Sequence, residues 1–182
     1  MGSRFALRLS GAGGHGLLLA GKVIAEAAVI YDGQTATQAQ SYGPEARGGV
    51  SRSDVVISDG DIDFPVATKL DFLLAMTQES IDAYLGDVKD GGTVLVDSGL
   101  VESVPEGNYR VVRAPIVETA RDRVGRPITA SLVAVGLIAG LTDIVTVPSF
   151  ELAVRARVPS GTEDANLTAF HAGLELSEKF RD

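Results

Sequence analysis

The spacing of hydrophobic residues near the amino terminus changes from a period of two to a helical period across a run of glycines. Phe5, Leu7 and Leu9 alternate with other residues, which indicates a β-strand. From Leu17 to Ala27 the apolar residues instead recur every three or four positions, which indicates a helix. The first part of the chain is therefore predicted to form a strand, a glycine loop and a helix.

Further along the chain, apolar runs and turn residues repeat this arrangement. The run from Phe72 to Met76 is followed by Thr77, a residue type that caps helix amino termini, and by a helix that Gly86 can end. Strands that alternate with helices are typical of a parallel sheet with helices on both faces. We expect other strands near residues 35–40, 54–58, 93–96 and 109–113.

The carboxyl-terminal third is predicted to be helical. Residues 128–141 are rich in small apolar side chains and most simply form a buried helix. Pro148 begins a second, short helix, and Ser160 stands three residues before Glu163, which is the spacing of a capping box at the start of the last helix. These patterns predict one α/β domain over residues 1–182, with a Rossmann-like, mostly parallel sheet and a helical carboxyl-terminal third.

The composition excludes several classes of function. The chain has 182 residues, a formal net charge of −8 and no cysteine. An acidic surface repels nucleic acids and anionic membranes, so we expect neither as a partner. Without cysteine the chain forms no disulfide and ligates no iron–sulfur cluster through thiolates. If electrons are transferred, another chain must carry them.

Metal binding and membrane insertion are not expected either. The two histidines, His15 and His171, lie far apart in the sequence, and we predict no metal site. The start of the chain lacks the apolar segment of a secretory signal. The longest apolar run, at 132–141, has about half the length that a membrane-spanning helix needs. We therefore expect a cytoplasmic protein.

The glycine loop after the first strand is one candidate binding site. Gly11, Gly13 and Gly16 fit the pattern G-x-G-x-x-G, and Gly14 and His15 complete the loop. Free N–H groups at the start of the next helix favour an anion, and the missing side chains let it approach closely. Three interpretations stay open: a dinucleotide, another anion or a partner's backbone, and tight packing of strand on helix alone. The dinucleotide is the weakest of them, because the second strand ends without the expected acidic residue.

A second glycine-rich segment, from Tyr42 to Ser51, combines backbone freedom with a rigid turn and opposite charges. Pro44 fixes one φ angle, and Arg47 offers a planar guanidinium to carboxylates or phosphates. Arg47 can pair with Glu45 and only order the loop, or it can face an anionic ligand or a partner together with Tyr42. The candidate binding residues of this segment are Tyr42, Gly43, Pro44, Glu45, Arg47, Gly48, Gly49 and Ser51.

No set of residues indicates catalysis by this chain alone. The order of serine, histidine and acidic residues suggests no nucleophilic triad, and Ser10, directly before the glycine loop, lacks the context of a nucleophile elbow. His171 is expected to be a packed or surface residue rather than a general base. We predict that the chain contributes no catalytic residue.

The two glycine segments together resemble the gamma subunit of 2-oxoacid:ferredoxin oxidoreductases. The likeness rests on the glycines of 11–16 and on the long motif of 41–51, and it continues through Ala114-Pro115, Val135-Gly136 and residues 166–173. It thus covers nearly the whole chain, and the Gln-Ser-Tyr form of the second segment is most similar to the 2-oxoglutarate type. The chain departs from the family at His15, where glutamine is usual, and at Ser131, where asparagine is usual. The resemblance therefore assigns no ligand contact to those two side chains.

This resemblance implies a complex that oxidatively decarboxylates a 2-oxoacid, 2-oxoglutarate in the first instance, and forms an acyl-CoA. Thiamine diphosphate and iron–sulfur clusters are then expected on partner subunits, with ferredoxin as electron acceptor. The gamma subunit is associated with closing the active site and contacting CoA, so both glycine segments should lie on one edge of the sheet and face the thiamine-binding subunits. Two alternatives are a free-standing, nucleotide-binding Rossmann-type oxidoreductase and a non-catalytic scaffold module whose glycines only pack.

Overall fold

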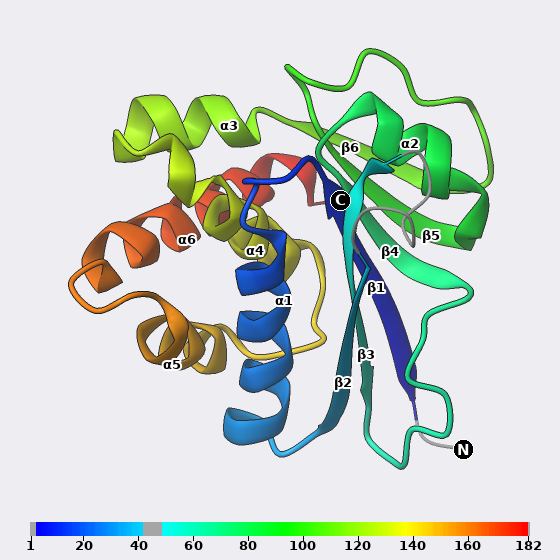
Figure 1. Cartoon of the computed structure of the whole chain (residues 1–182), viewed down its shortest axis with the longest axis horizontal. Coiled ribbons are helices and arrows are strands. Elements are labelled where there is room, and N and C mark those ends of the chain that lie inside the picture. The colour runs from blue at the N-terminus through cyan, green and yellow to red at the C-terminus, as the bar shows by residue number, and fades with distance from the viewer. Residues whose placement is uncertain (1–2, 42–48, 182) are drawn as a thin grey trace.

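The computed structural model describes residues 3–41 and 49–181, which form a six-stranded sheet with helices on both faces (Figure 1). The strands are β1 Arg4–Gly11, β2 Thr35–Ser41, β3 Ser51–Ser58, β4 Leu70–Ala75, β5 Val88–Asp97 and β6 Arg110–Ala114. The α-helices are α1 Leu17–Glu26, α2 Gln78–Tyr84, α3 Ile116–Thr119, α4 Ala130–Leu141, α5 Val147–Arg157 and α6 Glu163–Ser177. Shorter 3-10 or π-helical segments are η1 Ala27–Tyr31, η4 Leu85–Asp87, η5 Ala120–Val124, η6 Pro127–Thr129 and η7 Glu178–Phe180.

The sheet has the strand order β2-β3-β1-β4-β5-β6. β1, β4, β5 and β6 pair in parallel, whereas β3 is antiparallel to both of its neighbours, β1 and β2. Because β2 and β3 follow each other in the chain and pair antiparallel, the chain reverses its direction along the sheet between them. The predicted Rossmann-like, mostly parallel α/β fold is confirmed, and the reversed strand β3 is a feature that the sequence patterns did not indicate.

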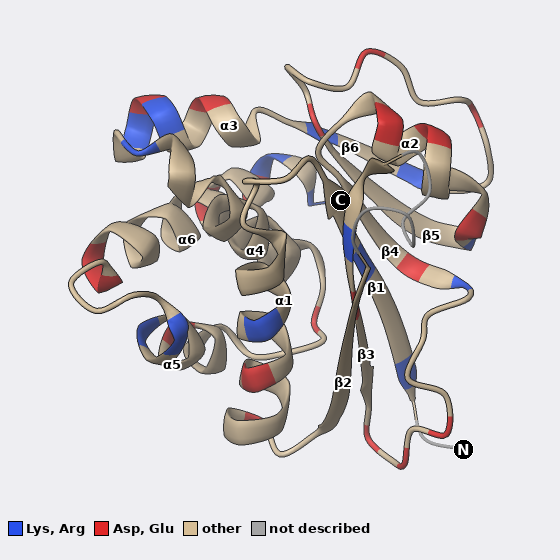
Figure 2. Ribbon diagram, viewed as in Figure 1, with Lys and Arg blue, Asp and Glu red and all other residues tan. Residues whose placement is uncertain are grey.

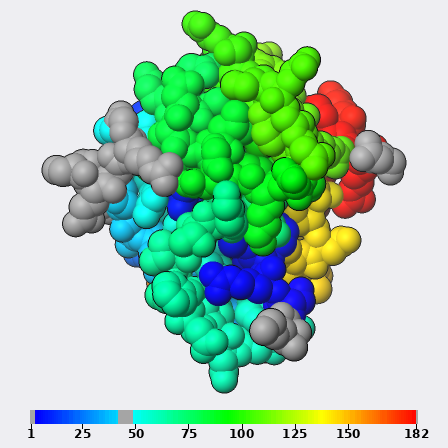
Figure 3. Space-filling view, turned by 90° about the vertical axis from the view of Figure 1, so that its right-hand side faces the viewer, coloured from blue at the N-terminus to red at the C-terminus, as the bar shows by residue number. Residues whose placement is uncertain are grey.

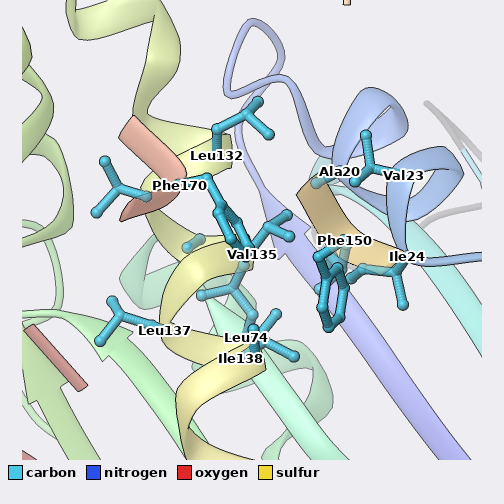
Figure 4. Close-up of a cluster of buried hydrophobic side chains, with 14 of the residues drawn as sticks. Ala20, Val23, Ile24, Leu74, Leu132, Val135, Leu137, Ile138, Phe150 and Phe170 are labelled. Carbon is cyan, nitrogen blue, oxygen red and sulfur yellow. The ribbon is translucent and has the colours of Figure 1, made fainter. Parts of the chain in front are cut away.

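The larger part of the core lies between one sheet face and the helices α1, α4, α5 and α6 (Figure 1). Alternate residues of β1, such as Leu7 and Leu9, point to this side and are fully buried. Figure 4 shows Phe150 and Phe170 in this cluster, and their ring centroids lie 5.8 Å apart. The apolar stripes on the helices and the sheet therefore meet in one continuous core.

The helices α4 and α6 pack with their backbones in direct contact. A Cβ atom added to Gly136 would lie 2.0 Å from the carbonyl oxygen of Phe170, and one added to Gly173 would lie 1.9 Å from that of Val133. Glycine at both positions lets the two helices approach this closely. The predicted buried helix is confirmed from Ala130 onward, since every residue of α4 except Leu141 is buried. Ile128, which was predicted to belong to it, lies in η6 and is exposed. Among the described helices, none is long and apolar enough to cross a membrane.

The opposite sheet face is covered by α2 and by coil segments. Figure 3 shows this side of the molecule, where α2 and the coils before and after it form the surface. The predicted cap is confirmed, because the Thr77 hydroxyl accepts a hydrogen bond from the Ser80 N–H at 3.3 Å. The side chain of Gln78 accepts hydrogen bonds from the N–H groups of Glu102 and Ser103, each at 3.0 Å, and so fastens the coil to the helix.

The predicted capping box at Ser160 is wrong. Thr162, not Ser160, stands at the amino terminus of α6, and the helix begins at Glu163. The Glu163 carboxylate accepts a hydrogen bond from the N–H of Gly161 at 2.8 Å. The acidic side chain thus stabilises the turn before the helix, as in a capping box. The helix itself begins two residues nearer to the carboxyl terminus than the capping-box spacing predicted.

Candidate anion-binding site

The glycine loop connects the carboxyl end of β1 to the start of α1, and its glycines have different roles. Gly14 and Gly16 have φ angles of 86° and 72°, which other residues rarely adopt. Gly11 and Gly16 also pack tightly: an added Cβ would lie 2.9 Å from the Met76 Cβ in the first case and 2.8 Å from the Ser131 Oγ in the second. A Cβ on Gly13 would meet no atom of the described residues within 4 Å. Packing therefore accounts for Gly11 and Gly16 but not for Gly13.

The amino terminus of α1 is left without a side-chain cap. The N-cap residue is Gly16, and the first turn holds no acidic residue. The Ala20 N–H bonds to the Gly16 carbonyl at 3.1 Å, so the N–H groups of Leu17, Leu18 and Leu19 precede the helical hydrogen bonds. Such groups, together with the helix dipole, attract an anion.

A cavity of about 380 Å³ lies next to this helix end. Its described wall contains no acidic residue, and Figure 2 shows the glycine loop and the first turn of α1 without charges. Backbone groups, small hydroxyls and Arg52 thus provide the polar surface of this cavity. The lining residues are Ala12, Gly13, Gly14, Gly16, Leu17, Leu18, Leu19, Ser51, Arg52, Ser53, Ile128 and Ser131.

Arg52 adds a cation beside the cavity, but its guanidinium is engaged on the other side of the sheet. The guanidinium carbon lies 5.8 Å from the centre of the Tyr84 ring, which belongs to α2. This placement follows from the alternation of side chains along β3, because Ser53 packs against Gly21 of α1 and Arg52 must point the opposite way. The anion site therefore depends on N–H groups more than on a positive side chain.

The two glycine segments meet at the edge of the sheet. Gly11 pairs with Ser51 across β1 and β3, and the Ser51 hydroxyl donates to the Gly11 carbonyl at 3.0 Å. Gly49 has a φ angle of 75°, which explains glycine at this position. The described residues at the carboxyl-terminal end of the second glycine segment thus lie beside the glycine loop. The other candidate residues of that segment, Tyr42, Gly43, Pro44, Glu45, Arg47 and Gly48, lie outside the described residues.

His15 is not among the described residues that line the cavity, and its side chain binds the loop itself. Its Nδ1 accepts a hydrogen bond from the Ala12 N–H at 3.1 Å. Burial lowers the pKa of the imidazole below its ordinary value, and the carboxylate of Asp97 opposes this effect without cancelling it. His15 is therefore mostly neutral at neutral pH.

A group of hydroxyls next to the loop was not found from the sequence. The Ser10 hydroxyl donates to the Ser51 carbonyl at 3.1 Å and lies 2.9 Å from the Ser80 hydroxyl. Ser80 in turn lies 3.0 Å from the Thr77 hydroxyl, Oγ to Oγ. These bonds connect β1, β3 and the start of α2. A serine inside an apolar strand, such as Ser10, is a sequence signal that could have indicated a buried hydroxyl contact.

A buried charge network supports the same strands from the α2 side. Arg8 and Asp54 are each 1% exposed and form two hydrogen bonds, of 2.7 and 2.9 Å. Arg8 also bonds to Asp87 at 2.7 Å and lies 4.7 Å from the centre of the Tyr84 ring. Burial disfavours the charge of Arg8, but the hydrogen bonds and charges of the two carboxylates outweigh it and raise the pKa. The signal for this network was a charged residue between Leu7 and Leu9 in a buried strand.

The sheet order argues against a dinucleotide at the glycine loop. In a dinucleotide-binding fold an acidic residue at the end of the strand next to β1 holds the ribose. Here β3, which runs in the opposite direction, lies between β1 and β2. The carboxyl end of β2, at Gln40 and Ser41, is therefore one strand farther from the loop and carries no acidic side chain.

Comparison with known proteins identifies the family. The family model described as pyruvate ferredoxin/flavodoxin oxidoreductase matches residues 6–176. The chain belongs to this family. The 2-oxoglutarate synthase subunit KorC of Methanocaldococcus jannaschii is 46% identical over 178 residues, which cover 97% of this chain and 95% of that protein.

Solved structures of oxidoreductase subunits share the fold. The gamma subunit of a keto/oxoacid ferredoxin oxidoreductase from Geobacter sulfurreducens has a TM-score of 0.90 at 49% identity, over 97% of this chain and 98% of that one. The 2-oxoglutarate:ferredoxin oxidoreductase from Magnetococcus marinus, solved with 2-oxoglutarate, coenzyme A and succinyl-CoA bound, has a TM-score of 0.83 at 18% identity. It covers 97% of this chain but only 31% of that longer chain. The resemblance to a gamma subunit is confirmed, and the chain is a subunit of an oxidoreductase.

Proposed function

We propose that this chain is the gamma subunit of a complex that oxidises 2-oxoglutarate to succinyl-CoA, with ferredoxin as electron acceptor, in the cytoplasm. The substrate assignment is supported by the relatives that are named 2-oxoglutarate synthase subunits and that match this chain over almost their whole length. The class of reaction follows from the family. The substrate side chain is expected to be recognised by other subunits.

In this proposal the glycine loop binds the phosphates of CoA. The observation that carries it is the combination of Gly13, which faces open space, with the uncapped start of α1 at the edge of a 380 Å³ cavity. Backbone N–H groups bind phosphate oxygens well at such a helix end. The M. marinus enzyme, which has the same fold, was solved with coenzyme A bound.

The role of the chain is binding and orientation, not proton transfer. Without cysteine it ligates no iron–sulfur cluster through thiolates, so the clusters are assigned to ferredoxin-like partner subunits. Thiamine diphosphate is assigned to the thiamine-binding partner subunits, as the family resemblance implies. Thiamine diphosphate supplies the carbanion chemistry where it is bound. The glycine loop and the segment Tyr42 to Ser51 would hold CoA in position and exclude water, which lowers the entropic cost of the acyl transfer.

A pair of nearly isosteric substitutions tests the CoA site in the assembled complex. Gly13→Asp places a carboxylate on the loop, and Gly13→Asn places an uncharged side chain of the same shape there; the space around Gly13 accepts both. A unit charge about 5 Å from a phosphate is unfavourable by about 3 kcal/mol at the effective dielectric of a protein surface, and by about 2–3 kcal/mol once salt screens it. We expect Gly13→Asp to raise KM for CoA by about 30- to 100-fold over Gly13→Asn, with KM for 2-oxoglutarate unchanged.

Equal KM values for CoA in the two variants would refute the phosphate site.

A second measurement tests whether the chemistry takes place on the partner subunits. The isolated chain is expected to show no oxidation of 2-oxoglutarate, and activity should return when the partner subunits are added. Turnover by the isolated chain would contradict the assignment of the chemistry to those subunits.

A further inference from the structure

His15 is the side chain that closes the glycine loop on itself. Its Nδ1 accepts from the Ala12 N–H at 3.1 Å, and its backbone N–H donates to the Ala12 carbonyl at 3.3 Å. The remaining positions between these residues, Gly13 and Gly14, have no side chains. The Ala12–His15 contact, which we call the clamp, is therefore the side-chain restraint on a segment that glycine otherwise leaves free.

The clamp requires one protonation state of the imidazole. Because the Ala12 N–H donates to Nδ1, this nitrogen must carry a lone pair, and the neutral ring then has its proton on Nε2. A proton added to Nδ1 would face the Ala12 N–H, so that two donors would oppose each other. Protonation of His15 is thus incompatible with the clamp.

The surroundings of His15 favour the neutral ring. Nδ1 lies against Gly11, where an added Cβ would come within 2.7 Å of it, and the same Cβ would also meet the uncharged side chains of Met76 and Leu17. Asp97, at the end of β5, is the carboxylate that acts on the ring, and it already accepts hydrogen bonds from the N–H groups of Gly99, Leu100 and Val117. Burial lowers the pKa of His15 in spite of Asp97. A pKa lowered in the folded state means that the clamp is intact above the ordinary histidine value of about 6.5 and is lost as the pH falls through the folded value.

We propose that His15 is the positioning residue of the CoA site, and that protonation of its Nδ1 releases the glycine loop and weakens CoA binding. This inference rests on the proposed function and adds to it the residue that shapes the loop and a dependence on pH. His15 acts through the backbone at Ala12 and contributes nothing to the reacting atoms. Its loss should therefore change KM for CoA and leave kcat at saturating CoA unaltered.

Two substitutions separate the hydrogen bond from the volume of the ring. In His15→Asn the Oδ1 atom can take the place of Nδ1 as acceptor, and it does not titrate; His15→Phe keeps the ring but removes the acceptor. The control is His171→Phe, because His171 is an exposed residue of α6 that pairs with Glu151 at 2.8 Å, away from the loop. Titration of CoA itself is common to all variants and cancels in their ratios.

The assay is KM for CoA in the assembled complex from pH 5.5 to pH 8. At pH 8 we expect His15→Phe to raise KM by about three- to tenfold, the loss of about one hydrogen bond, and His15→Asn and His171→Phe to match the unaltered enzyme. As the pH falls through the lowered pKa of His15, KM of the unaltered enzyme should rise relative to that of His15→Asn. Equal KM values for His15→Phe and the unaltered enzyme, or for His15→Phe and His15→Asn, would overturn the inference.

A measurement without CoA keeps the inference separate from the proposed function. The chain has only two histidines, so nitrogen NMR of the full chain resolves both imidazoles. At pH 8 we expect an unprotonated Nδ1 at His15 and a slowly exchanging Ala12 amide, whose protection His15→Phe removes; a protonated Nδ1 in the neutral ring would refute the clamp. If Gly13→Asp raises KM for CoA but His15→Phe does not, this inference fails alone, whereas failure of Gly13→Asp refutes the CoA site itself.

Discussion

Replacement of Gly136 by alanine should force α4 and α6 apart. The new Cβ would lie 2.0 Å from the Phe170 carbonyl oxygen, 2.7 Å from the Leu174 nitrogen and 3.0 Å from the Gly173 Cα. All three atoms belong to the backbone of α6, so no side-chain rotation relieves the overlap. Ordinary contact begins near 3.4 Å, which means that the helix must recede by about 1.4 Å at this point.

The energetic cost follows from the packing around these helices. Overpacking of a well-packed core costs about 1–3 kcal/mol, and the rigid backbone contact places Gly136→Ala at the upper end of this range or beyond it. Alanine recovers about 1 kcal/mol of helix propensity. We therefore expect the free energy of unfolding to fall by about 2–3 kcal/mol and Tm by about 5–10 °C for a chain of this size.

Urea denaturation followed by far-ultraviolet circular dichroism measures this change, because the chain has no tryptophan. The control is Gly86→Ala, since a Cβ there would meet no atom within 4 Å. Gly173→Ala introduces the reciprocal overlap, and its combination with Gly136→Ala should cost less than the two single changes together, because the helices are already separated. The reasoning would be refuted if Gly136→Ala were as stable as Gly86→Ala.

Three further substitutions test separate contacts. Asp32 accepts hydrogen bonds from Ser149 and from the start of α5, and these bonds outweigh the effect of burial and lower the pKa of its carboxylate. Asp32→Ala should therefore lower the free energy of unfolding by about 1 kcal/mol at pH 7, and by progressively less as the pH falls through the acidic range. Urea denaturation at several pH values measures this change. Arg8→Ala leaves Asp54 buried without its partner and should cost about 3–5 kcal/mol in the same assay; a cost below 1 kcal/mol would contradict the network. Thr77→Ala removes the cap of α2 and should cost about 1 kcal/mol, with faster amide exchange in the first turn of α2 as the independent sign.

The sequence predicts local structure well because local spacing decides it. The change of period across Gly11 to Gly16 located β1 and α1, and the apolar run of 128–141 located α4. The direction of β3 was missed, although the sequence predicted no helix between the strands near residues 35–40 and 54–58, which was a usable signal for a hairpin. The glycine pattern also suggested the binding loop, but only the structure separates Gly13, which faces open space, from Gly11 and Gly16, which pack.

Contacts between distant parts of the chain were beyond the sequence patterns. Asp32 precedes β2 and yet bonds to Thr146 and Ser149, more than a hundred residues away. The close approach of Gly136 to α6 likewise depends on how two helices cross, and no spacing within either helix reveals it. Tertiary packing, which sets such pairs, has no local signature.

The reversed strand β3 has a consequence for how enzymes of this family can diversify. A crossover between parallel strands must traverse the sheet, so its length is constrained, but the connection from Ser41 to Ser51 begins and ends at the same edge. Residues can be added or removed there while Gly11 and Ser51 remain paired. The residues of this connection are thus not needed to hold the neighbouring strands in register, which leaves their sequence free to serve binding.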